Sequence, residues 1–107
     1  MTNPRLYTFR SMVAKSPQNP LARFGLANEC LKAGLYEEAV EHLRAYLAMH
    51  DDEGNAYGRL AEALDKLGRA REARVALRAG IEAAQQHGHP GMASEFETRL
   101  EEMGDDA

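Results

Sequence analysis

The sequence contains no tryptophan, one cysteine and only 7% aromatic residues. A lone cysteine, Cys30, cannot form an internal disulfide, which fits a reducing compartment, and we expect a cytoplasmic protein. No apolar run approaches the roughly 20 residues needed to cross a bilayer, and Met1 to Arg10 lack the apolar stretch of a secretory signal. We therefore expect no membrane association. The net charge of −4 disfavours nucleic-acid binding, which depends on neutralising phosphates.

What the sequence does contain is a repeat with a period of 34 residues. When residues 20–50 are compared with residues 54–84, ten of the 31 pairs are identical. Leu26, Ala27 and Cys30 would share one face of a helix, and Leu60, Ala61 and Leu64 repeat that face. Gly34 and Gly68 follow these helices at the position where a left-handed residue favours glycine. Ala39, Leu43 and Tyr46 form the stripe of a second helix, which Ala73, Leu77 and Gly80 repeat.

This pattern resembles the tetratricopeptide repeat, a 34-residue helix–turn–helix with a Leu–Ala pair in its first helix, a turn glycine, and Ala then Leu in its second. Tyr57 occupies the early aromatic position in the second repeat, whereas Arg23 stands there in the first, next to Phe24. Asp51 replaces the usual proline between repeats. The resemblance covers about two-thirds of the chain. It implies an all-α, right-handed solenoid of antiparallel helical hairpins.

The flanking segments extend this array. Pro17 stands where the family places its inter-repeat proline, so residues 4–17 are predicted to be the second half of a repeat, with Leu6, Phe9, Met12 and Val13 facing inward. Asn3 and Asn19, each followed by proline, are good N-caps. We predict one domain, 1–107, with this half-repeat, repeat one at 20–53, repeat two at 54–87 and a capping helix at 90–104. The six predicted helices span 4–15, 20–33, 36–50, 53–67, 70–87 and 91–103.

The resemblance implies a function, because the first helix of each hairpin in such arrays lines a concave groove that holds peptides or protein segments. The matching positions are Leu21, Phe24, Asn28, Leu31 and Lys32 in repeat one, and Asn55, Gly58, Arg59, Glu62, Asp65 and Lys66 in repeat two. Alternatively, Phe24 packs against the helix at 4–15 and the polar residues are merely solvated. The carboxylate clamp of chaperone-binding members is not expected, because only Asn28 matches its pattern.

Other charged and nucleophilic residues admit simpler interpretations. Glu62 and Asp65, with Glu29 one repeat earlier, would suit a basic partner segment or form a mixed solvated face. Arg71, Arg74 and Arg78 follow one helical stripe, for which a solvated convex face is preferred to an RNA site.

His87 and His89 lack a third ligand at suitable spacing, His42 and His50 are expected to be exposed, and Cys30 to be a buried small side chain. We predict no enzyme, no cofactor and no metal. The predicted function is a protein-interaction module or adaptor. The alternative is a structural homo-oligomer, formed through the exposed face of the helix at 4–15.

Overall fold

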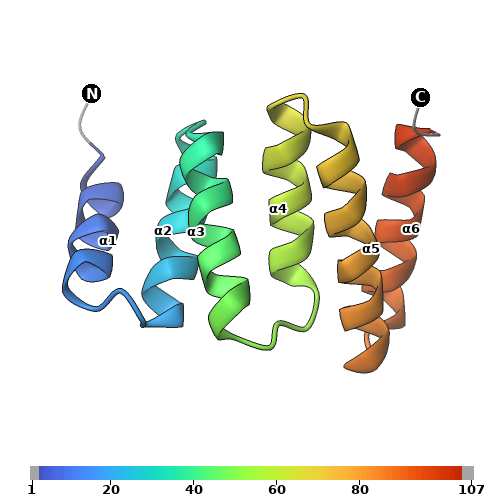
Figure 1. The fold of residues 1–107 in the computed structure, drawn as a ribbon, viewed down its shortest axis with the longest axis horizontal. Helices are drawn as coiled ribbons and strands as arrows, with labels where there is room; N and C mark the ends of the chain where they lie inside the picture. Colours follow the sequence, from blue (N-terminus) through green and yellow to red (C-terminus); the bar gives the residue numbers. More distant parts are fainter. Residues whose placement is uncertain (1–2, 105–107) are drawn as a thin grey trace. The chain divides into compact units, whose positions relative to one another are not determined.

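The computed structural model describes residues 3–104, which form six α-helices and no strand (Figure 1). The helices are α1 (Pro4–Lys15), α2 (Pro20–Lys32), α3 (Tyr36–Met49), α4 (Asn55–Lys66), α5 (Ala70–Gln86) and α6 (Pro90–Met103). Every predicted helix is present, with its ends within two residues of the predicted ones. No helix among the described residues is both long and apolar enough to span a membrane.

The chain divides into two compact units, one ending at His50 and the other beginning at Asp51. The first unit contains the hairpin α2–α3 with α1 packed on α2, and the second contains the hairpin α4–α5 with α6 packed on α5. The expectation of a single domain stays a prediction.

The turns of the two hairpins have the same geometry because each contains a glycine in the left-handed region. Gly34 has a φ of 74° and Gly68 a φ of 77°. After each glycine, one backbone N–H bonds back into the last helical turn, from Leu35 to the carbonyl of Cys30 at 2.9 Å and from Arg69 to that of Leu64 at 2.8 Å. Gly88, with a φ of 76°, makes a third turn of this kind between α5 and α6. A side chain at these positions would be strained, so the spacing of the glycines sets the lengths of the helices.

The helix starts follow from their capping side chains. Asn3 accepts the N–H of Leu6, and Asn19 accepts that of Leu21, as predicted for two Asn–Pro starts. The start of α4 was not predicted correctly, since the helix begins at Asn55 rather than at residue 53. The carboxylate of buried Asp52 accepts the N–H groups of Gly54 at 2.8 Å and Ala56 at 2.9 Å, so it satisfies backbone donors just ahead of the helix.

Small residues allow the helices to approach closely in both units. In the first unit the ring of Phe9 on α1 lies over Gly25 of α2, where an added Cβ would come within 2.2 Å of the ring. In the second unit the ring of Phe96 on α6 lies against Gly58 and Gly80. A phenylalanine packed on helical glycine therefore attaches the single helix of each unit to its hairpin.

The inward face predicted for the first helix is only partly correct. Leu6 and Val13 are buried and Phe9 is half-buried, but the side chain of Met12 is 41% exposed. In a complete repeat a partner helix would lie on the other side of α1. Without one among the described residues, only the stripe that meets α2 is covered.

Candidate interaction surface

The first unit presents the predicted groove residues along one face of α2. Leu21 is 78% exposed, Lys32 is exposed, and Phe24, Asn28 and Leu31 are half-buried. Their spacing of three or four residues keeps them on one side of the helix, while Ala22, Leu26, Ala27 and Cys30 are buried on the other. These five side chains therefore lie on one side of α2, and their use as a binding groove stays a prediction.

Two of these residues also have structural roles. The ring of Phe24 lies 4.9 Å from the ring of Tyr46 on α3, so Phe24 stabilises the hairpin as well as contributing surface. The alternative interpretation placed Phe24 against the helix at 4–15, whereas the ring contact that the structure shows is with Tyr46. Lys32 makes an ion pair with the buried carboxylate of Glu29 at 3.4 Å. Leu21 and Asn28 remain the better candidates for contacts with a partner.

Asn28 has an incompletely satisfied side chain. Its Oδ1 is buried and accepts no hydrogen bond within residues 3–104. A buried acceptor without a donor costs free energy. The peptide contact at Asn28 stays a prediction.

The second unit presents the corresponding face of α4. Asn55, Glu62, Asp65 and Lys66 are exposed, and Arg59 is half-buried. Gly58, which was predicted to lie in the groove, does not belong to this surface. The ring of Phe96 covers it, and Arg99 donates a hydrogen bond to its carbonyl at 3.3 Å. The prediction for Gly58 was wrong because the repeat pattern does not show where the capping helix lies.

A cleft of about 370 Å³ opens between α4, α5 and α6. It is lined by Ala61, Asp65, Leu77, Arg99, Glu102 and Met103. The apolar lining comes from Ala61, Leu77 and Met103, while Asp65 and Glu102 bring two carboxylates and Arg99 one guanidinium. Because Arg99 also lies 5.7 Å from the ring of Phe96, it is held by its own unit. The lining carries one more negative than positive charge.

The structure corrects two expectations about basic residues. Arg74 is buried, and its Nε donates to the carbonyl of Gly104 at 3.4 Å, so Arg71, Arg74 and Arg78 do not form a solvated stripe. His42, which was expected to be exposed, is only 6% exposed. Two other histidines lie beside carboxylates near the start of the second unit: His87 pairs with Asp51, and His89 pairs with Glu53.

Two arginines on α1 pair with carboxylates of the hairpin α2–α3. Arg5 binds Glu29 at 3.1 Å, and Arg10 binds Glu38 through two hydrogen bonds of 2.7 and 3.1 Å. Burial alone would raise the pKa of Glu29, but the hydrogen bonds from Arg5 and Lys32 outweigh it and lower the pKa. The hydrogen bonds from Arg10 likewise lower the pKa of Glu38. Ion pairs thus attach α1 alongside Phe9.

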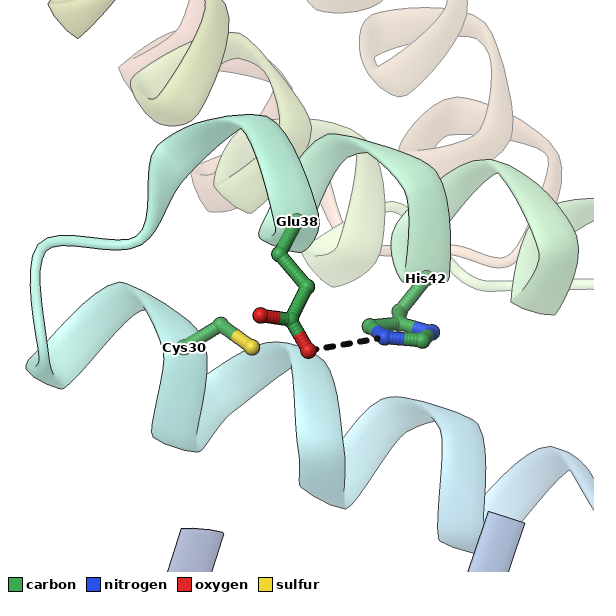
Figure 2. Close-up of side chains that lie close together, drawn as sticks. All are labelled: Cys30, Glu38 and His42. Atoms are coloured by element: carbon green, nitrogen blue, oxygen red, sulfur yellow. Dashed lines mark ion pairs between the residues drawn. The ribbon is translucent and has the colours of Figure 1, made fainter. Parts of the chain in front are cut away.

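One cluster that was not predicted from the sequence is formed by Cys30, Glu38 and His42. Figure 2 shows the carboxylate of Glu38 between the sulfur of Cys30 and the ring of His42. The prediction that Cys30 is buried is confirmed, and burial raises the pKa of its thiol to about 12. The signal was present in the sequence: Cys30 and Glu38 each stand four residues from the turn at Gly34, so a hairpin brings them opposite each other.

Comparison with known proteins agrees with this fold. A family model described as tetratricopeptide repeat matches residues 30–93, which is more than half of the chain. No curated protein sequence matches the chain significantly. The solution structure of protein BPP2914 from Bordetella parapertussis is similar with a TM-score of 0.80 and 27% sequence identity, over 96% of this chain and 89% of that one. Repeats of this kind are generally protein-interaction modules, and the chain belongs to the tetratricopeptide repeat family.

Proposed function

We propose that this chain is an adaptor, without catalysis, that binds a partner protein on the exposed face of α2 in the first unit and on the corresponding face of α4 in the second. The observation that supports this most is Leu21. Leu21 is a large apolar side chain that is 78% exposed, and it stands at a position that the family uses for binding. The opposite face of α2 is buried in the hairpin. The half-buried Asn28 lies on the same side of this helix as Leu21.

The chemistry of the two faces suggests the character of the partner. The α2 face offers Leu21 and the half-buried Leu31 as apolar contacts. The α4 face offers Glu62 and Asp65, and the cleft beside it adds the carboxylate of Glu102. Apolar side chains of a partner would complement the α2 face, and Lys or Arg side chains would complement the α4 face. A largely preformed surface would also lower the ordering cost of binding.

The single buried cysteine supports a role in the cytoplasm.

A pull-down with a charge-matched control tests the proposal. The double variant Leu21→Glu, Glu62→Arg changes the proposed surface at two exposed positions. The control is the double variant Val75→Glu, Glu82→Arg, which makes the same changes of charge at two exposed positions of α5. We expect the wild type and the α5 variant to retain the same partner from native lysate, and the first variant to lose it. Equal retention by both folded variants would contradict the proposed surface.

A second candidate function is self-association, which the exposure of Tyr7 (76%) and Met12 (41%) on α1 favours. Sedimentation equilibrium over a wide concentration range distinguishes the two functions. A mass that rises with concentration, and that Tyr7→Ala with Met12→Ala returns to the monomer, would support a homo-oligomer. A constant monomer mass would exclude it and leave the adaptor.

A further inference from the structure

We propose that Cys30, Glu38 and His42 form a binding site for one divalent cation that binds thiolate, such as Zn²⁺. The three side chains offer ligand atoms that all lie within 4.8 Å of one another (Figure 2). They come from both helices of the first hairpin, Cys30 from α2 and the other two from one face of α3. The site lies within one compact unit and is independent of the proposed interaction surface.

The type and burial of the donors favour zinc over harder cations. Thiolate, imidazole and carboxylate are the three ligand classes of zinc sites, whereas Mg²⁺ and Ca²⁺ select oxygen. Cys30 is fully buried and His42 is 6% exposed, so two of the ligands are already held by packing. The side chain of Glu38 is 30% exposed and provides the edge through which a cation and a fourth, water ligand could enter.

Binding requires the cluster to contract. Bonds of about 2.0–2.3 Å to a tetrahedral zinc put its ligands roughly 3.3–3.7 Å apart, so the most distant pair would approach by about 1 Å. The carboxylate of Glu38 already lies 3.4 Å from Nε2 of His42. Side-chain rotation would have to supply this change, since Cys30 and Glu38 lie on the two helices of one hairpin.

Two arginines now satisfy the polar groups that a cation would use. Arg10 binds both oxygens of Glu38, and Nη1 of Arg23 lies 3.0 Å from Nδ1 of His42. Because a guanidinium only donates, Nδ1 is the acceptor, and Nε2 carries the proton that faces Glu38. For Nε2 to bind a cation, the ring must change tautomer and Nη1 of Arg23 must turn away. The head of Arg10, whose side chain is 46% exposed, must move into water.

The charges and protons balance. The thiol of Cys30 loses its proton to solvent on coordination, as thiols do on zinc. Glu38 is already ionised, and the tautomer change at His42 moves a proton without a net loss. One proton is therefore released per cation, and the two anionic ligands neutralise its double charge. Since Arg10 loses its partner on α3, cation binding would also weaken the attachment of α1.

Cobalt titration of the reduced, full-length chain tests the site, because Co²⁺ bound to thiolate gives a charge-transfer band in the near ultraviolet. Cys30 is the only cysteine, so this band can report no other residue. We expect saturation at one Co²⁺ per chain, loss of the band on addition of one equivalent of Zn²⁺, and no band in Cys30→Ser. No band in the wild type with excess Co²⁺, or saturation at one Co²⁺ per two chains, would overturn the proposal.

Arginine variants provide a test that does not alter the ligands. Arg10→Ala removes a competitor for Glu38 and a repelling charge, so the cation should bind at least about tenfold more tightly. Arg5→Ala is the matched control on the same helix. Because Arg5 pairs with Glu29 and not with Glu38, its removal should leave the affinity for the cation within about twofold of the wild-type value. Equal affinities of Arg10→Ala and the wild type would mean that Glu38 is not a ligand.

Ligand variants complete the test. His42→Gln and Glu38→Gln should each weaken Co²⁺ binding by about tenfold or more, since each removes one of three donors. His87→Ala with His89→Ala removes the two histidine–carboxylate pairs of the second unit and should leave the charge-transfer band unchanged. A band that survives His42→Gln with unchanged affinity would contradict the assignment.

Discussion

Replacing Gly25 by alanine probes the attachment of α1 to its hairpin. A Cβ at this position would lie 2.2, 2.7 and 2.8 Å from three carbons of the Phe9 ring. Carbon atoms pack best at about 3.5–4.0 Å, so the ring must retreat by roughly 1.3 Å or more. Forcing such a shift typically costs about 1–3 kcal/mol.

The substitution Gly25→Ala also has a stabilising effect on the helix, which has to be separated from the cost of displacing the ring of Phe9. Alanine is better than glycine inside a helix by about 1 kcal/mol. We therefore expect Gly25→Ala to destabilise the wild type by a net of about 1 kcal/mol. In a Phe9→Ala background no ring opposes the new methyl group, so the same change should stabilise the protein by about 1 kcal/mol. The coupling between the two sites is then about 2 kcal/mol.

Urea denaturation of the four proteins of this double-mutant cycle measures the coupling. Gly91→Ala is the control, because an added Cβ there meets nothing within 4 Å and the backbone is helical. It should not destabilise the protein. If Gly25→Ala changes the free energy of unfolding equally with and without the ring of Phe9, the contact does not attach α1, and the packing described for the first unit is wrong.

Three further predictions follow from capping, packing and charge. Ala39 is fully buried, so Ala39→Leu should lower stability by about 1–3 kcal/mol through overpacking, and an unchanged melting temperature would argue against the assigned helix face. Asp52→Ala should lower stability by about 0.5–2 kcal/mol through loss of the cap of α4, whereas Asp51→Ala, at an exposed neighbour, should have less effect in the same melting experiment. The folded pKa values of Glu29 and Glu38 lie below the ordinary 4.5, so their contribution to stability is present above that pH and is lost as the pH falls through the folded values. Replacing both by glutamine should flatten this acid dependence in urea titrations from pH 6 to 3, and an unchanged slope would show that the ion pairs contribute little.

The hairpins were predictable because their determinants are local. Gly34 and Gly68 fix the turns by their backbone conformation, and the stripes of Leu and Ala fix the buried faces. Asn3 and Asn19 fix two helix starts through bonds to backbone groups two or three residues away. Each of these effects acts within a few residues, so the sequence pattern carries it directly.

The features that were not predicted depend on contacts between distant residues. Nothing near Gly58 in the sequence indicates that Phe96 covers it. His42 is buried, and its Nδ1 lies 3.0 Å from Nη1 of Arg23, which is 19 residues away on another helix. Arg74 is buried although arginine is seldom found inside proteins, and its Nε bonds to a carbonyl 30 residues away. Charged and aromatic positions of this kind require the tertiary structure.

Site-specific photo-crosslinking in intact cells shows whether a partner binds on the exposed faces of α2 and α4. A photoreactive phenylalanine replaces Leu21 in one protein and Val75 of α5, which is 63% exposed, in the other. We expect the probe at residue 21 to form a crosslink to one partner protein, and the probe at residue 75 to form no crosslink to that protein. Crosslinks to the same partner from residue 75 alone would place the binding surface on α5 and contradict the account.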